Sequence, residues 1–184
     1  MSAEKIVDTR ITGGLYRGRK IESPHSELTH PMGSRERLAI MNSLGARIAG
    51  VNIVDAYAGS GALGIEALSR GANHVTFIEK NHKVANVLKN NLKNLGVDED
   101  KYTVVETSVN VYGVQNADVV IFDPPYDKIN EFIKSFSEIF ENFKSATTFV
   151  ISYPKGTELK IVELGNFACS TRTYAGANIS IFTK

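Results

Sequence analysis

The chain has 184 residues, enough for about one domain, and its 42% hydrophobic and 22% charged residues are typical of a globular protein and exclude a disordered one. Its 21 Lys and Arg against 20 Asp and Glu give a net charge of +1, so any nucleic-acid surface must come from local clustering of basic residues. A single cysteine excludes an internal disulfide, and no apolar run reaches the about 18 residues of a membrane span, so we expect a soluble, cytoplasmic protein.

The first part of the chain predicts a hairpin followed by a helix. Residues 10–21 carry two short strand patterns around a glycine turn. From Ser34 onwards, apolar residues recur at helical spacing, and Ser34 stands where an N-cap would be expected.

Strands and helices then alternate. Strand patterns cover residues 52–56, 74–79, 102–106, 118–123 and 148–153, and helical patterns follow the first, second and fourth of them. Residues 167–183 predict a closing hairpin, in which we expect Cys169 to be buried. This alternation indicates an α/β fold with a mostly parallel sheet covered on both faces. Ligands of such sheets bind beyond the carboxyl ends of the strands, where Asp55, Glu79 and Asp123 would share a crevice.

A glycine-rich turn follows the first of these strands, in the sequence DAYAGSGALG that begins at Asp55. Glycines let the backbone approach a ligand closely, and the helix that follows offers free N–H groups. The spacing of Gly59, Gly61 and Gly64 is also compatible with a dinucleotide-binding site, or with a turn that binds no ligand. However, Asp55 would repel a pyrophosphate and suits S-adenosylmethionine, which has an ammonium and a sulfonium. Glu79, at the end of the next strand, can accept hydrogen bonds from ribose hydroxyls.

The segment Asp123-Pro124-Pro125-Tyr126 ends the fourth of these strands. Consecutive prolines make a stiff bend that aims the neighbouring groups. The Asp123 carboxylate and the Pro124 carbonyl can both accept hydrogen bonds from the exocyclic amine of a base and direct its lone pair at a methyl group. Tyr126 can stack on a base that has left its helix. The pattern therefore predicts methyl transfer to an amino group, the alternative being a strand end with a solvated Asp123.

Together these motifs resemble class I S-adenosylmethionine-dependent methyltransferases that act on amino groups. Residues 55–72 and the opening residues 10–20 are similar to the RsmD family, which methylates a guanine N2 in bacterial small-subunit rRNA, and Pro31, residues 34–37 and Asn42 match it too. The resemblance implies a Rossmann-like class I methyltransferase fold with a mostly parallel seven-stranded sheet, helices on both faces and an N-terminal β-hairpin extension. We expect one domain over residues 1–184, with the extension at 1–33 and the catalytic core at 34–184.

The resemblance also implies the site residues. The cofactor-binding set is Asp55, Tyr57, Ala58, Gly59, Ser60, Gly61, Glu79, Lys80 and Ser108, and the catalytic set is Asp123, Pro124, Pro125 and Tyr126. The chain departs from the family pattern at His30, Met32 and Leu38, and at Ser108, where an Asp or Asn often faces the adenine amine. We expect no metal, because the four histidines show no zinc-ligand spacing.

Basic residues are concentrated in residues 10–37, where six of them stand against three acids. We expect this set to contact RNA phosphates, although a solvated surface would give the same pattern: Arg10, Arg17, Arg19, Lys20, Arg35 and Arg37.

The expected function is transfer of a methyl group from S-adenosylmethionine to a guanine N2 of 16S rRNA, on the 30S subunit or an assembly intermediate, by a monomer. One alternative keeps the chemistry and changes the target to adenine N6 in DNA or RNA. The others are a nicotinamide-dependent oxidoreductase and a cofactor-binding assembly factor.

Overall fold

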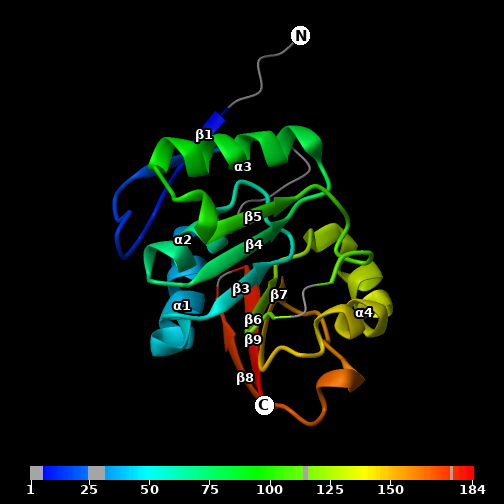
Figure 1. Ribbon diagram of the computed structural model, residues 1–184. Coiled ribbons are helices and arrows are strands. Elements are labelled where there is room, and N and C mark those ends of the chain that lie inside the picture. Colours follow the sequence, from blue (N-terminus) through cyan, green and yellow to red (C-terminus); the bar gives the residue numbers. More distant parts are fainter. Residues whose placement is uncertain (1–5, 25–31, 114–115, 175) are drawn as a thin grey trace.

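A seven-stranded sheet runs through the molecule, and a separate two-stranded hairpin lies beside it (Figure 1). This computed structural model describes residues 6–24, 32–113, 116–174 and 176–184, so His30 and Pro31, singled out above, lie outside the described residues. The strands are β1 (Ile6–Arg10), β2 (Lys20–Pro24), β3 (Asn52–Asp55), β4 (His74–Ile78), β5 (Tyr102–Val105), β6 (Val119–Phe122), β7 (Thr148–Pro154), β8 (Ala168–Thr173) and β9 (Ala177–Thr183). The α-helices are α1 (Ser34–Leu44), α2 (Ala62–Ser69), α3 (His82–Leu95) and α4 (Ile129–Phe143), with short 3-10 turns that include η1 (Gly45–Ile48) and η3 (Tyr126–Lys128).

The large sheet has the strand order β5-β4-β3-β6-β7-β9-β8. The first five strands of this order pair in parallel, and β9 runs antiparallel between β7 and β8. The mostly parallel seven-stranded sheet and the closing hairpin are therefore confirmed. The order of the strands reverses at β3, because β4 lies on one side of it and β6 on the other. Open sheets of this kind bind ligands at such a reversal.

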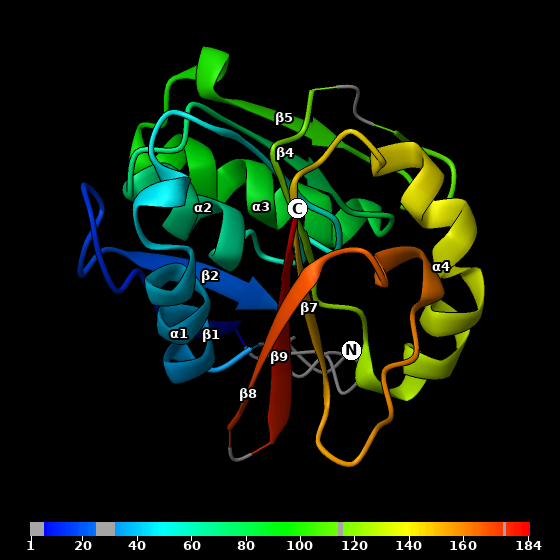
Figure 2. The same cartoon turned by 90° about the horizontal axis from the view of Figure 1, so that it is seen from below.

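Helices cover both faces of this sheet, as predicted. Figure 2 shows α4 on one side of the strands and α1, α2 and α3 on the other. Two hydrophobic clusters match this division: one joins α1, α2 and α3 to the sheet through residues such as Met41 and Leu88, and the other joins α4 through Phe132, Phe136 and Phe143. The apolar stripe of residues 129–143 is thus a core face. None of the helices in the described part of the chain is both long and apolar enough to cross a bilayer.

Three local predictions were wrong. Ser34 is the first residue of α1 and not its N-cap, a position taken by Gly33 without a side-chain bond. The N-terminal hairpin is present, but its strands cover residues 6–10 and 20–24 and not the predicted 10–21, because residues 12–16 between them bond to α2; for example, Leu15 N–H donates to the Ser69 carbonyl at 2.7 Å. Cys169 is exposed, because β8 is the edge strand and all six of its residues are exposed.

Candidate functional site

Three acidic side chains meet at one edge of the sheet, where β3, β4 and β6 end. In the strand register, Asp55 lies opposite Phe77 of β4 and Ile121 of β6. Glu79 and Asp123 each come two residues after these partners, so both follow their strands at the level of the turn after β3. The charges of Asp123 and Glu79 both act on Asp55 and raise its pKa, as expected for neighbouring acids. The structure therefore brings together the three acids that the sequence assigned to one crevice.

Asp55 is a buried carboxylate with one oxygen unused. It is 1% exposed, and its Oδ2 accepts a hydrogen bond from Gly64 N–H at 2.9 Å, which fixes the start of α2. Its Oδ1 is buried and, among the described residues, has no hydrogen-bond partner. Burial, reinforced by the neighbouring acids, raises the pKa of Asp55 to about 7. A buried acceptor without a donor is costly, and a ligand with a positively charged N–H group would satisfy it.

The turn after β3 adopts a conformation that requires glycine. Gly59 and Gly61 have φ values of 53° and 85°. A Cβ on Gly61 would lie 2.2 Å from Cδ1 of Leu88, so α3 packs directly on the turn, whereas a Cβ on Gly59 would have no atom within 4 Å. Gly59 therefore borders open space that a ligand can enter.

Glu79 holds this turn through its carboxylate. Its Oε2 accepts from Gly59 N–H at 3.0 Å, and its Oε1 accepts from Asn81 N–H at 2.8 Å. Each carboxylate oxygen has a second lone pair, so Glu79 can still accept hydrogen bonds from a ligand's hydroxyls.

The Asp-Pro-Pro-Tyr segment is anchored by Ser152 of β7, which sequence reasoning missed. The hydroxyl oxygens of Tyr126 and Ser152 lie 3.1 Å apart, which is within hydrogen-bond distance. Burial raises the pKa of Asp123 to about 6, and a hydrogen bond from Ser152 opposes the rise. Pro124 is buried, and the Pro125 carbonyl accepts from Lys128 N–H at 2.9 Å, which closes η3. The segment is therefore held at both ends, with Asp123 and Tyr126 partly exposed toward the crevice.

The remaining predicted cofactor residues lie in the turn after β3 or follow the ends of β4 and β5. Tyr57 is half-buried and packs edge-on against Phe132, with ring centroids 6.0 Å apart. Ala58 is buried and donates its N–H to the Ile78 carbonyl, which joins the turn to β4. Lys80 is exposed beside Glu79, and Ser108, half-buried after β5, accepts a bond from Val111 N–H at its carbonyl. Of these residues, only the exposed Lys80 carries a charge.

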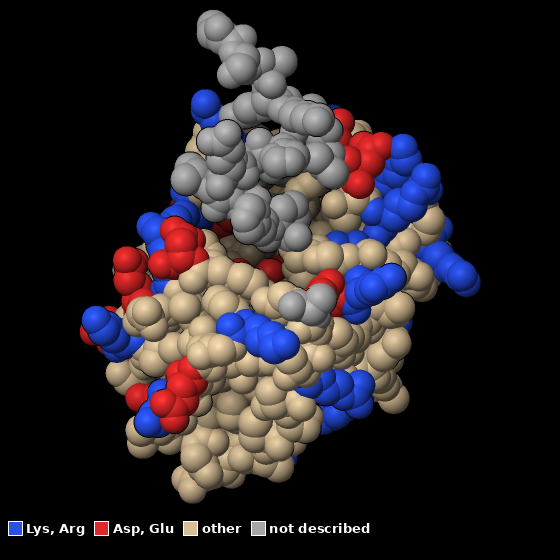
Figure 3. Space-filling view, turned by 180° about the vertical axis from the view of Figure 1, so that it is seen from behind, with Lys and Arg blue, Asp and Glu red and all other residues tan. Residues whose placement is uncertain are grey.

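Five of the six basic residues predicted to contact RNA are exposed: Arg10, Arg17, Arg19, Lys20 and Arg35. Arg37 is not one of them, because it is 2% exposed and donates to the carbonyls of Met32 and Arg10, each at 2.9 Å. A guanidinium committed to buried backbone carbonyls cannot also reach a phosphate, so Arg37 is withdrawn from the RNA set. Figure 3 shows basic side chains crowding the upper right of the face, beside a hollow in which acidic atoms are visible.

The hairpin is held to the helices by buried polar side chains that had no assigned role in the sequence. The Glu66 carboxylate of α2, 0% exposed, accepts from Thr12 N–H at 2.8 Å and from the Thr12 hydroxyl at 2.7 Å. The Asn91 amide of α3, 2% exposed, exchanges bonds with Glu22 N–H and the Glu22 carbonyl of β2 at 2.9 and 2.8 Å. It also donates to the Ser60 carbonyl at 3.0 Å. Asn91 thus joins the hairpin to the glycine-rich turn.

We expect the substitution Asn91→Ala to destabilise the protein by about 2 kcal/mol, because it leaves a buried carbonyl of Ser60 and two part-buried backbone groups of Glu22 without partners. Urea unfolding measures this difference. The matched control is Asn90→Ala, since Asn90 is exposed on the same helix, and its effect should stay within about 0.5 kcal/mol. Equal losses in the two variants would mean that Asn91 does not hold the hairpin to the turn.

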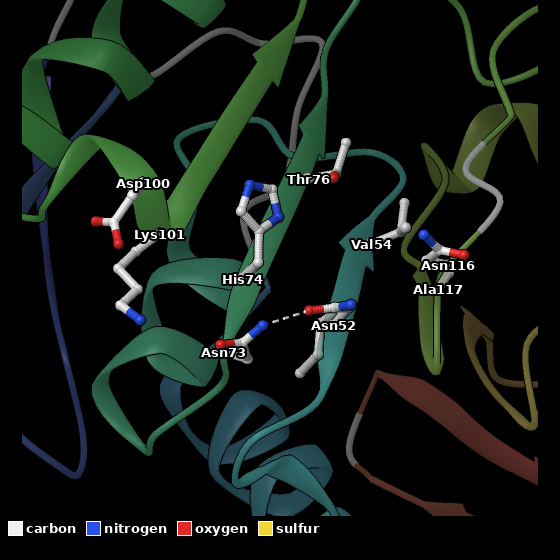
Figure 4. Close-up of a pocket in the computed structure, with 10 residues that line it drawn as sticks. Asn52, Val54, Asn73, His74, Thr76, Asp100, Lys101, Asn116 and Ala117 are labelled. Atoms are coloured by element: carbon white, nitrogen blue, oxygen red, sulfur yellow. Dashed lines mark hydrogen bonds between the residues drawn. The ribbon is translucent and has the colours of Figure 1, made fainter.

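A polar pocket of about 410 Å³ lies at the opposite edge of the sheet, where β3 and β4 begin (Figure 4). Its amide side chains bond to each other, with Asn73 Nδ2 donating to Asn52 Oδ1 at 2.9 Å. Ligands of open α/β sheets bind at the other edge, so this pocket is not the candidate site. Over the described ranges, no three His, Cys, Asp or Glu side chains are grouped as a metal site requires.

Comparisons with known proteins agree with this geometry. A family model described as conserved hypothetical protein 95 matches residues 9–183. The ribosomal RNA small subunit methyltransferase D of Haemophilus influenzae is 40% identical over 65% of this chain, and the match spans 64% of that protein's length. A solved Escherichia coli protein is 26% identical with a TM-score of 0.82, covering 97% of this chain and 98% of that one. The structure of magnesium protoporphyrin IX methyltransferase of Synechocystis with bound SAH has a TM-score of 0.68 over 82% of each chain. It is 15% identical to this chain, so the likeness concerns the fold alone.

Proposed function

The chain belongs to the family described as conserved hypothetical protein 95, the RsmD family, and from this premise we propose that it transfers a methyl group from S-adenosylmethionine to a guanine N2 of 16S rRNA. The observation that carries the proposal is the meeting of Asp55, Glu79 and Asp123 at the ends of β3, β4 and β6, with Tyr126 beside them. The first two acids suit the cofactor, and the third suits an amine.

The residues after β3 and β4 fit S-adenosylmethionine. The unpartnered Oδ1 of Asp55 is an acceptor for its ammonium, and the open space at Gly59 lets its methionine part approach the backbone. Glu79 has lone pairs left for two ribose hydroxyls, and we assign Lys80 and Ser108, which follow β4 and β5, to the base. When bound, the cofactor supplies an electrophilic methyl group on sulfur. A pyrophosphate would place negative charge beside these acids, which disfavours the hypothesis of a nicotinamide-dependent oxidoreductase.

The residues after β6 fit the amino group of a base. The Asp123 carboxylate and the Pro124 carbonyl accept hydrogen bonds from the two N–H groups of the amine, so that its lone pair points to the cofactor side. The stiff proline bend and the bond between Tyr126 and Ser152 hold these acceptors in place before the base arrives. The methylated nitrogen then loses a proton to water or to Asp123. Tyr126 offers a ring on which the extruded base can stack.

We assign rRNA contact to the hairpin and the start of α1. Arg10, Arg17, Arg19, Lys20 and Arg35 are exposed there and contribute positive charge that bulk composition does not provide. The substrate in this proposal is 16S rRNA within the 30S subunit or its assembly intermediate, and the enzyme acts as a monomer formed by one domain. The same acceptors suit adenine N6, which is the second candidate target.

The test is methyl transfer from labelled S-adenosylmethionine to 30S subunits and to 16S rRNA from cells that lack this protein, followed by digestion to nucleosides. We expect the label in N2-methylguanosine. Label in N6-methyladenosine would overturn the target base and keep the chemistry. No label in either RNA from a protein that binds S-adenosylhomocysteine would overturn RNA methylation.

A further inference from the structure

A second groove, of about 260 Å³, lies between the end of α1 and the edge of the sheet formed by β8 and β9. Its polar lining comprises Ser43, Arg47, Cys169, Ser170, Arg172 and Thr183. It therefore presents two guanidinium groups, three hydroxyls and a thiol, with no carboxylate among its lining residues. This donor-rich composition is the opposite of the acidic crevice at the ends of β3, β4 and β6.

The two arginines of this groove have no negative partner among the described residues. Arg47, in η1, donates from Nη2 to the Ser43 carbonyl of α1 at 3.2 Å, and none of the ion pairs within the described ranges involves either arginine. Like charges that share a groove repel each other unless an anion lies between them. Guanidinium groups are suited to bidentate contact with phosphate oxygens, and neighbouring hydroxyls can donate to the same oxygens.

Along β8 the groove runs from the level of the start of β7, where Thr183 pairs with Thr148, to the level of Ser152 near the candidate site. Arg172 of β8 lies opposite Ile179 of β9, which in turn lies opposite Ser152 of β7. Directly paired residues point to the same face of a sheet, and Ser43 and Arg47 of the α1 side line the groove with Arg172. Neighbouring strands are about 4.8 Å apart, so Arg172 stands about 10 Å from Ser152, the residue that bonds to Tyr126. An RNA strand that delivers a base to Asp123 and Tyr126 is therefore within reach of Arg172.

We propose that this groove binds the phosphodiester backbone of the RNA strand beside the target nucleotide, with Arg172 of β8 nearer to the reacting base and Arg47 of η1 farther from it. The inference rests on the proposed function for the identity of the RNA. The groove itself carries no chemistry: it fixes the register of the strand, because phosphate contacts position a nucleic acid without reading its bases.

The test compares the double variant Arg47→Ala/Arg172→Ala with the wild type in binding to 16S rRNA over a range of salt concentrations. We expect an about 10-fold weaker affinity at 0.1 M salt, and a slope of log affinity against log salt that is less negative by about 1.4, as for two lost phosphate contacts to a single strand. The matched control is Lys101→Ala/Lys134→Ala, which removes the same charge from two lysines that are in no ion pair among the described residues: one lies before β5, at the far end of the sheet from β8, and the other lies on α4, on the opposite face. S-adenosylhomocysteine affinity should stay unchanged in both variants.

The outcomes separate this inference from the proposed function. A wild type that binds and methylates rRNA, with a double variant of unchanged affinity and salt slope, would overturn the groove alone. Equal losses in the variant and the lysine control would also overturn it, since only bulk charge would then matter. A wild type that binds S-adenosylhomocysteine but neither binds nor methylates rRNA would overturn both. Restored affinity in Arg47→Lys/Arg172→Lys would show that charge at these positions, without bidentate geometry, is sufficient.

Discussion

The substitution Asp123→Asn should lower the rate of methyl transfer by about 100- to 1000-fold and leave the affinity for S-adenosylhomocysteine within a few-fold of the wild type. The carboxylate is held after β6 to accept hydrogen bonds from an amine, and an amide presents only one acceptor oxygen and turns N–H groups toward the substrate. Losing one preorganised polar contact to a reacting group typically has an effect of this size. Single-turnover methyl transfer and equilibrium binding of S-adenosylhomocysteine measure the two quantities separately.

The pH dependence of the rate is a second test of the role of Asp123. Because burial raises the pKa of Asp123 to about 6, its carboxylate becomes protonated as the pH falls through 6. The wild-type rate should therefore fall about 10-fold per pH unit below 6, and the Asn variant should lose this dependence. Asp127→Asn is the matched control, because Asp127 is exposed four residues along the same segment, and it should keep both the rate and the profile. Near wild-type activity in Asp123→Asn would remove Asp123 from the amine site.

The sequence predicts the positions of the acids better than it predicts their surroundings. Asp55, Glu79 and Asp123 end apolar segments, and the rule that parallel strands end at one edge is enough to bring them together. Ser152 and Asn91 were missed for a different reason: each is a polar residue within an otherwise buried strand or helix face, and its partner is distant in the sequence. A polar residue among Leu88, Leu92 and Leu95 was the available signal for Asn91.

The errors have a common physical origin in tertiary contacts. Arg37 belongs to a basic segment that predicts phosphate contact, yet its guanidinium donates to the backbone carbonyls of Met32 and Arg10. Cys169 looked like a core residue, but its strand is the last in the sheet, and strand order is not readable from alternation alone. Both positions depend on which element lies alongside, and single-sequence patterns do not specify this.

The substitution Asp55→Asn should have opposite effects on binding and on stability. We expect the affinity for S-adenosylhomocysteine to fall by about 10- to 100-fold, because the ligand's ammonium loses a charged acceptor at Oδ1. The unliganded variant should nevertheless be more stable than the wild type at pH 8, by about 1–2 kcal/mol. The asparagine can still accept from Gly64 N–H, and it removes a buried negative charge that lies near Asp123 and Glu79.

The pH dependence fixes the sign of this stability effect. Burial raises the pKa of Asp55 from 3.8 to about 7, so the folded protein binds a proton that the unfolded chain releases, and ionisation of Asp55 costs stability progressively from pH 4 to above pH 7. The stability of the Asn variant relative to the wild type should therefore be highest at pH 8 and lower by about 2–3 kcal/mol at pH 5, as measured by urea unfolding at both values. Asp100→Asn, an exposed position away from the site, should show neither effect. A variant that is less stable than the wild type at pH 8, with unchanged ligand affinity, would make Asp55 a structural cap of α2 and remove it from the cofactor site.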